Sequence, residues 1–365
     1  MKDIAIMTFN QAINYGAVFQ MYALQKTVNK LGASCDIINY QSAPLSQIYR
    51  KRTVKDWMTP KKLYSVFFHN SYIKYNYDGF AKFLSERIQL SEIVYHNYNE
   101  LLSANEQYRK FIAGSDQVFN LFCCSYDENY FLPFVQNSDV KYSYAASLGL
   151  SEIPRDLEET YKRLLSGFKK LSIREKTGAH VLHELLGKEC QVHLDPTLLL
   201  DKEEWHRISV PYKVPEKYIL VYLLSEDKEL FTYAKRLAKK NKCEIIYIND
   251  RLIPQIGMEN KRRVNPDEWL TLFGNASAIV TNSYHGLLFS INFNKTVYPF
   301  LLNRNDKINS RAIDFLEVLD LSHLLTENYR ERMAVGTEIL NGANKQLLAL
   351  EKERSIAYIK NIIDC

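Results

Sequence analysis

IVTNSYHGLLFSI, residues 279–291, carries the clearest structural signal in this 365-residue chain. Its first two residues continue from Ala278 as a short apolar run, which is typical of a buried parallel strand. The run stops at three polar residues, 281–283, and leucine and isoleucine then recur at helical spacing. The segment therefore predicts a strand, a polar turn and a helix in direct succession.

His285 lies at the start of that predicted helix. The first turn of a helix has free N–H groups and the positive end of the helix dipole, so it attracts anions. A histidine there can also move protons near neutral pH. The turn therefore predicts chemistry on a phosphorylated or carboxylated substrate, and the competing interpretation is that His285 is only a neighbour of the helix cap.

The length exceeds that of one usual core, so we expect two domains. A hydrophobic content of 46% and a charged content of 24% indicate a folded protein rather than a disordered one. The formal net charge is +5, and the positive charges are spread along the chain. This balance favours anionic partners and gives no reason to expect nucleic-acid binding.

Six cysteines, none at the spacing of a zinc or redox motif, predict reduced thiols in a cytoplasmic protein. The chain runs from Met1 directly into a strand-like segment, so we expect no signal peptide. It also has no apolar run of about 18 residues, so we expect no membrane span. The eight histidines make no ligand pattern, and we expect no metal site.

Short apolar runs alternate with amphipathic stretches in two series, which predicts parallel sheets covered by helices on both faces. The first series, residues 1–209, includes expected strands at 142–146 and 192–194. A linker with two prolines leads to the second series, residues 215–327. The tail, residues 328–365, is expected to be largely helical and to pack back on the N-terminal domain.

A basic and aromatic segment near residues 47–85 interrupts the first series. One interpretation is a lid, or a surface that meets anionic lipid head groups on the inner face of the membrane. The other is an inserted helical pair with a solvated basic face.

Polar turns follow the expected strands, and ligands of doubly wound sheets bind at such strand ends. Asn14 and Gly16 follow the first strand, where one glycine replaces the three of a dinucleotide fingerprint. Both residues also suit a plain tight turn. Asp116, which follows Gly114, could accept a proton or hold a sugar hydroxyl, or it could simply cap a sharp turn.

Two further strand ends carry charged residues. Arg174 suits a carboxylate or phosphate because its planar guanidinium donates two parallel hydrogen bonds, although a surface pair with Glu175 is the alternative. Asp195 precedes Pro196 and is interpreted as a structural turn former. His193 lies between apolar residues and is expected to be a core histidine.

Taken in order, these motifs resemble the polysaccharide pyruvyl transferase family. The resemblance runs from residue 4 to about residue 320, and Phe119 departs from it, because relatives often have tryptophan there. It is carried by the segments NYGAVFQ (14–20), GSDQV (114–118), SIRE (172–175), DPTLL (195–199), TNSYHG (281–286) and SR (310–311).

The resemblance implies an α/β fold similar to GT-B glycosyltransferases, with two Rossmann-like doubly wound domains that face a cleft. It implies transfer of the pyruvyl group of phosphoenolpyruvate to two sugar hydroxyls as a cyclic ketal, with no cofactor. His285 would then be the general acid, Arg174 would hold the donor, and Asp116 would be the base. The substrate-binding residues would be Asn14, Tyr15, Gly16, Ser115, Asn282, Ser283, Tyr284, Gly286 and Arg311.

The expected acceptor is a sugar of a surface or capsular polysaccharide precursor, free or on a lipid diphosphate, and the sequence does not identify that sugar. Two alternatives remain open at this point. One is a nucleotide-sugar glycosyltransferase of the same architecture, and the other is an inactive relative that acts as a binding partner in polysaccharide assembly. One architecture hosts many reactions, so fold alone does not separate them.

Overall fold

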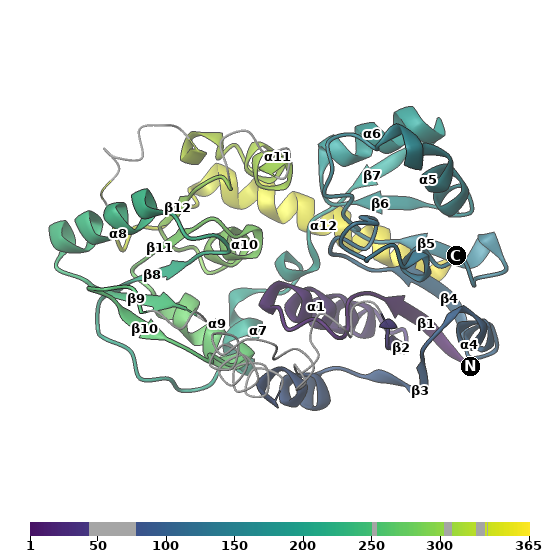
Figure 1. Ribbon diagram of the computed structural model, residues 1–365, viewed down its shortest axis with the longest axis horizontal. Coiled ribbons are helices and arrows are strands. Elements are labelled where there is room, and N and C mark those ends of the chain that lie inside the picture. The colour runs from purple at the N-terminus through teal and green to yellow at the C-terminus, as the bar shows by residue number, and fades with distance from the viewer. Residues whose placement is uncertain (44–77, 250–253, 303–308, 326–332, 334) are drawn as a thin grey trace, which may run out of the picture.

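A computed structural model shows two α/β halves side by side (Figure 1). It describes residues 1–43, 78–249, 254–302, 309–325, 333 and 335–365. Most of the basic and aromatic segment, residues 47–77, lies outside the described residues, so the interpretations as a lid or as a membrane contact stay predictions. The described end of that segment, residues 78–87, is helical, and its Phe80 and Phe83 are buried rather than on a solvated face.

The N-terminal half is built on a parallel sheet with the order β3-β2-β1-β4-β5. Bridges from Tyr142 to Lys170 and from Ala146 to Ile173 continue this sheet to the parallel pair β6-β7. Its elements are β1 (Lys2–Met7), α1 (Tyr15–Lys30), β2 (Cys35–Tyr40), β3 (Leu90–Tyr95), α4 (Tyr98–Leu101), β4 (Tyr108–Ala113), β5 (Lys141–Ser143), α5 (Glu158–Leu165), β6 (Leu171–Ile173), α6 (Lys176–Leu186) and β7 (Cys190–Val192).

The C-terminal half repeats this order in a second parallel sheet, β10-β9-β8-β11-β12. In each half the chain starts in the middle of the sheet, moves to one edge and then crosses to the other, as in Rossmann-like folds. The elements are α7 (Lys202–Ile208), β8 (Tyr218–Tyr222), α8 (Lys228–Asn241), β9 (Glu244–Ile248), β10 (Glu259–Lys261), α9 (Pro266–Asn275), β11 (Ala278–Thr281), α10 (Tyr284–Asn292), β12 (Val297–Pro299), α11 (Ser310–Val318) and α12 (Gly342–Asp364). The expected fold class, two Rossmann-like domains in a GT-B-like arrangement, is confirmed.

One hydrophobic core joins the two halves. Alternate residues of β1 enter different clusters: Ile4 and Ile6 face the joint core, whereas Ala5 and Met7 face a separate outer cluster. The strands of the second sheet divide in the same way between the joint core and a third cluster. The middle of the joint core is aromatic, and it includes Phe19 from α1, Trp205 from α7, Trp269 from α9 and Phe289 from α10. The two halves are therefore held in one relative position by apolar packing.

The tail differs from its expected form at its start. Residues 335–341 are not helical, and α12 begins only at Gly342, where Asn341 and Asn344 form a capping box. From there α12 runs across the molecule to the N-terminal half, so that both chain ends lie at the same end (Figure 1). The Tyr358 hydroxyl donates to the backbone oxygen of Ser143, and this bond fastens α12 beside β5.

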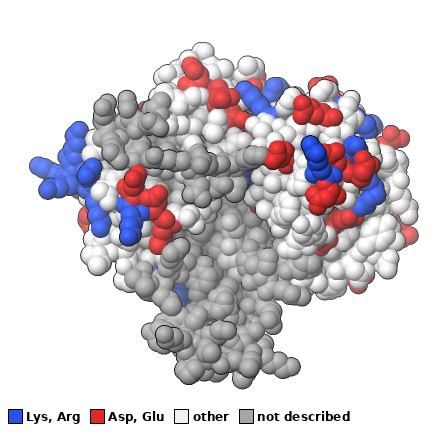
Figure 2. Space-filling model, turned by 45° about the horizontal axis from the view of Figure 1, so that its top comes forward, with Lys and Arg blue, Asp and Glu red and all other residues white. Residues whose placement is uncertain are grey.

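Charged side chains of both signs are mixed over the face that Figure 2 shows, with a basic group at its left end. Figure 1 places α8 at that end, and α8 exposes Lys228, Lys235, Arg236, Lys239 and Lys240. Within the part of the chain that the structure describes, no helix is both long and apolar enough to cross a membrane.

Candidate active site

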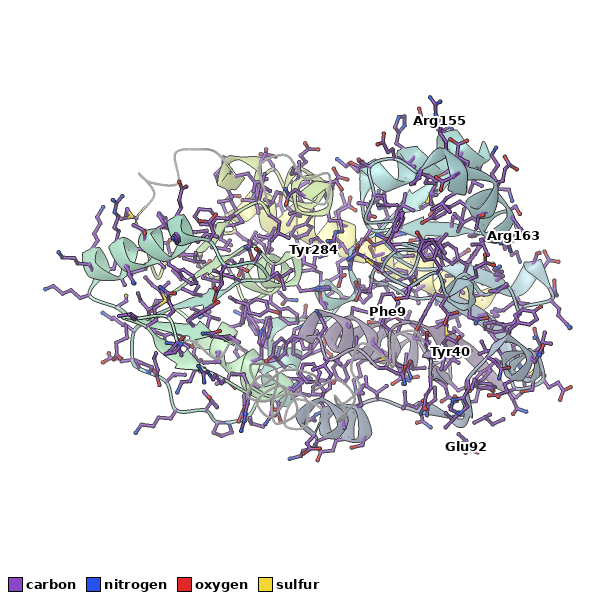
Figure 3. All side chains as sticks on the ribbon, viewed as in Figure 1. Phe9, Tyr40, Glu92, Arg155, Arg163 and Tyr284 are labelled. Atoms are coloured by element: carbon purple, nitrogen blue, oxygen red, sulfur yellow. The ribbon has the colours of Figure 1, made fainter. Side chains whose placement is uncertain are left out.

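A cavity of about 220 Å³ lies where strand ends of both halves meet. Because parallel strands point the same way, the residues that follow them gather at one edge of each sheet. Phe9 follows β1 and Tyr284 follows β11, and the two lie between the halves in Figure 3. The cavity is lined by Phe9, Ala12, Asn14, Gly16, Ala17, Asp116, Gln117, Cys123, Tyr222, Leu224, Ser283, Tyr284, His285 and Arg311.

His285 enters the cavity from the first turn of α10. The predicted strand, turn and helix are confirmed as β11, a short turn and α10. Ser283 is the N-cap, and its hydroxyl accepts the amide of Gly286 at 3.2 Å. The cap gives a partner to one of the backbone N–H groups of the first turn, which have none within the helix. The N–H groups of the residues before Gly286 likewise have no partner within the helix.

The start of α1 meets His285 directly. Asn14 caps this helix and accepts the amide of Ala17 at 3.2 Å. Gly16 packs so closely against the imidazole that a Cβ atom on Gly16 would lie 2.0 Å from Nδ1 of His285. The first turns of two helices, one from each half, therefore flank the same cavity, and both carry the partial positive charge of a helix N-terminus.

A buried ionic cluster lies behind the cavity wall. Nη1 of Arg174 donates to Oδ2 of Asp195 at 2.8 Å, and both side chains are fully buried. Nε2 of His285 lies 3.4 Å from the same carboxylate oxygen, as an ionic contact longer than an ordinary hydrogen bond. Burial opposes ionisation of Asp195, but His285, Arg174 and the Thr197 amide outweigh it and hold the pKa of the Asp195 carboxyl well below its usual range.

Tyr284 stands between two cations. The guanidinium of Arg174 lies 4.7 Å from the centre of its ring, and that of Arg311 lies 5.4 Å away. Arg311 is 9% exposed, and it forms no salt bridge with any carboxylate of the described residues. Burial, with Arg174 nearby, lowers the pKa of Arg311 from its ordinary value. The Arg311 charge is thus under-compensated, so an anion in the cavity would stabilise it.

Asp116 reaches the cavity from the turn after β4. Its backbone has φ of 76°, a left-handed conformation that costs energy in a residue other than glycine. Its Oδ1 accepts the amide of Gln117 at 2.9 Å and lies 3.4 Å from Nη2 of Arg174. A strained backbone conformation persists only where the surrounding structure holds it in place, and such residues are often found at functional sites.

Five expected site residues do not line the cavity. Tyr15 turns into the joint core, where its hydroxyl donates to the backbone oxygen of Val264 at 2.7 Å. Ser115 is fully buried and donates to the backbone oxygen of Ala145. The side-chain amide of Asn282 forms hydrogen bonds with the backbone of the loop after β8. The backbone N–H of Gly286 donates to the Ser283 cap. Arg174 is enclosed by Asp195, Asp116 and Tyr284, and its expected role of holding the donor stays a prediction.

Asp195 is the main residue that the sequence analysis missed. It does form a turn, since Oδ1 accepts the amide and the hydroxyl of Thr197 at 3.0 and 2.8 Å, but its other oxygen faces Arg174 and His285. Its place after β7, at the edge where the other strand ends meet, is the signal that could have identified it. His193 is a core histidine as predicted, bonded to Ser172 and packed on Tyr358.

Within the described residues, no three His, Cys, Asp or Glu side chains gather as a group that could hold a metal ion. Cys123 and Cys124 are adjacent free cysteines, and Cys123 lines the cavity. Burial raises the pKa of the Cys123 thiol, which disfavours the reactive thiolate.

The structure is similar to several nucleotide-sugar enzymes at low sequence identity. A putative UDP-N-acetylglucosamine 2-epimerase from Listeria monocytogenes aligns at a TM-score of 0.49 with 12% identity, over 97% of each chain. The UDP-GlcNAc 2-epimerase from Methanocaldococcus jannaschii gives a TM-score of 0.49 with 15% identity, over 96% of this chain and 91% of that one. A UDP-glucosyltransferase from Polygonum tinctorium gives a TM-score of 0.42 with 9% identity, over 100% and 99%.

No curated protein matches the sequence. The profile of the family described as polysaccharide pyruvyl transferase matches residues 14–303, a range that holds the first turn of α1, Arg174, Asp195 and His285. This match covers most of the chain, including every strand of the two sheets except β1. The chain therefore belongs to the polysaccharide pyruvyl transferase family.

Proposed function

We propose that the protein transfers the pyruvyl group of phosphoenolpyruvate onto two hydroxyls of a sugar and forms a cyclic ketal. The observation that carries this proposal is a cavity in which two helix N-termini, the under-compensated Arg311 and the imidazole of His285 meet. The first three features bind an anion, and the fourth supplies a proton. We propose that the acceptor belongs to a surface or capsular polysaccharide precursor and that no cofactor takes part.

The size and charge of the cavity suit the donor. A volume of about 220 Å³ corresponds to roughly seven water molecules, which is enough for a compact phosphoester. A drug-sized ligand usually occupies about 300 Å³ or more, so the cavity is small for a nucleotide sugar. The phosphate and carboxylate of phosphoenolpyruvate would be bound by Arg311 and by the free amides of α1 and α10.

The first step needs an acid. The imidazolium of His285 gives its proton to the methylene carbon of phosphoenolpyruvate, and the electron pair of the C2–C3 double bond forms the new C–H bond. C2 becomes an electrophilic oxocarbenium centre that still carries the phosphate. The helix N-termini and Arg311 retain the phosphate charge while the positive charge develops on C2.

The second step needs a base. One sugar hydroxyl adds to C2 and loses its proton to Asp116, which reaches the cavity and has the geometry of a strained functional residue. The second hydroxyl then displaces phosphate from C2, and its proton leaves with the phosphate. The products are inorganic phosphate and a sugar that carries a pyruvyl ketal, so atoms and charge balance.

Arg311→Met tests the donor site. The variant keeps an unbranched apolar side chain, and it removes the guanidinium, which lies over the ring of Tyr284 and carries the charge that faces the cavity. We expect the dissociation constant for phosphoenolpyruvate to rise about tenfold to a hundredfold, because a charged hydrogen bond is worth about 1.5–3 kcal/mol. Isothermal titration calorimetry measures it, and Arg236→Met on the exposed face of α8 is the control. Unchanged affinity would place the donor elsewhere.

The reaction itself is tested by incubation with phosphoenolpyruvate and a panel of sugar acceptors. We expect release of inorganic phosphate and a product that is heavier than the acceptor by the mass of one pyruvic acid less one water. Stabilisation by a uridine diphosphate sugar, with none by phosphoenolpyruvate, would instead indicate a nucleotide-sugar glycosyltransferase. Binding of a polysaccharide precursor without turnover of either donor would indicate an inactive relative.

A further inference from the structure

We propose that Asp195 is the positioning residue of His285: it holds the Nε2 side of the imidazole, so that the proton is transferred from Nδ1. This inference rests on the proposed function, because it assigns the atom through which His285 acts in that reaction. It also assigns a role to a buried carboxylate for which the donor and acceptor chemistry has no direct use.

The two oxygens of the Asp195 carboxylate have different partners. Oδ1 accepts two hydrogen bonds from Thr197, from the amide at 3.0 Å and from the hydroxyl at 2.8 Å. With Oδ1 so occupied, Oδ2 is directed to Arg174 at 2.8 Å and to His285 at 3.4 Å. Such a carboxylate cannot turn away from the imidazole without breaking the bonds to Thr197.

The turn that carries Asp195 is also fastened to the helix that carries His285. The side-chain amide of Asn292, the last residue of α10, donates to the backbone oxygens of Thr197 at 2.9 Å and of Leu200 at 3.0 Å. The indole of Trp205 donates to the same Thr197 oxygen at 3.1 Å. One end of α10 thus binds the turn through Asn292, and the other presents His285 to Asp195. The distance between carboxylate and imidazole is therefore set by the joint core.

The two ring nitrogens of His285 have different surroundings. Nε2 is buried and makes no hydrogen bond within the described residues, and it lies 3.4 Å from Oδ2 of Asp195. Nδ1 lies against Gly16, at the wall where the first turn of α1 lines the cavity. A carboxylate favours an N–H group in front of it, so the proton on Nε2 stays with Asp195. Nδ1 is then the nitrogen that can give a proton to the methylene carbon.

Among the charged groups around the imidazole, Asp195 is the one in direct contact with it. Arg174 lies behind the same carboxylate, and Arg311 and Asp116 line the same cavity. The ring of Tyr284 stands edge-on to the imidazole at 5.4 Å. Of these groups only Asp195 makes an ionic contact with His285. Asp195 is therefore placed to orient the imidazole that acts in the first step.

Asp195→Asn removes the charge of the carboxylate and keeps the shape of the side chain. We expect kcat to fall about tenfold to a hundredfold, with the KM for phosphoenolpyruvate within about threefold of wild type. A side chain that only supports the fold would lower the melting temperature and leave kcat of the folded protein in place. A kcat equal to that of wild type would overturn the proposal.

Nuclear magnetic resonance of the unliganded protein, with ¹⁵N-labelled histidine, separates this proposal from the proposed function. The His285 signals are identified by their loss in His285→Gln. We expect Nδ1 to be the unprotonated nitrogen of the neutral imidazole, and we expect this preference between the two nitrogens to weaken in Asp195→Asn. This result without pyruvyl transfer would support the positioning role and contradict the reaction. Pyruvyl transfer with an Nδ1–H tautomer at high pH would contradict the positioning role alone.

Thr197→Val is the second variant, for the case that Asp195→Asn does not fold. It removes one of the two hydrogen bonds that direct the carboxylate and leaves its charge in place. We expect kcat to fall about threefold to tenfold with little change in KM, because the carboxylate loses orientation rather than charge. A kcat equal to that of wild type would mean that the orientation of Asp195 is irrelevant to catalysis.

Discussion

His285→Gln is expected to lower the rate of pyruvyl transfer about 10³-fold or more. Glutamine fills similar space and still forms hydrogen bonds, but it cannot give a proton to carbon. General acid catalysis contributes about 10²- to 10⁴-fold, and protonation of the methylene carbon has to precede both sugar additions, so nothing later in the reaction compensates. Steady-state release of inorganic phosphate in the presence of the acceptor measures the loss.

The matched control for this variant is His180→Gln. His180 lies on α6, is largely exposed, and pairs with Glu184 one turn further along the helix. We expect the control to retain the wild-type rate, because exposed pairs contribute little to stability. Phosphoenolpyruvate should still bind to His285→Gln, since Arg311 and the two helix N-termini remain. A His285→Gln enzyme with more than about a tenth of the wild-type kcat would remove this residue from the role of general acid.

The sequence was sufficient to predict those strands and helices whose residues show a clear local periodicity. Residues 279–291 form the strand, turn and helix that the pattern predicts. The edge strands β3 and β10 were not anticipated. Half of the residues of β3 are exposed, and β10 is a three-residue polar strand, so neither gives an apolar run. The expected strands at 142–146 and 192–194 are offset, and β5 and β7 end at Ser143 and Val192.

The candidate site was predictable only in part, for a different physical reason. The sequence places Arg174 at the end of a strand and identifies Arg311 through the resemblance, but it contains no measure of the depth of either side chain. In the structure the first is enclosed by carboxylates and the second faces the cavity. The role of Asp195 depends in the same way on a contact with His285 across the joint between the two halves. Tyr15, one residue before Gly16, turns into the joint core because α1 begins at that position.

This division of roles between the two arginines has a consequence for binding. A ligand that displaced Arg174 from Asp195 would leave a buried carboxylate without its partner, which is costly. A ligand beside Arg311 breaks no ion pair of the described residues and compensates a buried charge. The donor is therefore expected to bind to Arg311 and the helix N-termini, while Arg174 keeps Asp195 ionised and Tyr284 in place.

Gly16→Ala is expected to reduce kcat about 10²-fold or more, although the substitution adds a single methyl group. The added Cβ would lie 2.0 Å from Nδ1 and 2.5 Å from Cε1 of His285, so the imidazole has to move. It cannot move towards Asp195, which is fixed by Thr197 and already lies 3.4 Å from Nε2. A misplacement of about 1 Å in a reacting group can cost about 10²-fold in rate. Steady-state kinetics of phosphate release measures the effect.

Gly342→Ala is the control that isolates this steric effect. Gly342 also lies in the first turn of a long helix, α12, and a Cβ atom there has no neighbour within 4 Å. Alanine favours a helix over glycine by about 1 kcal/mol in both places, so helix propensity predicts slight stabilisation of both variants and a loss of activity in neither. A loss confined to Gly16→Ala therefore has to come from the contact with His285. If both variants kept wild-type kcat, the imidazole would not need the position that the structure gives it, and the assignment of the proton to Nδ1 would fall with it.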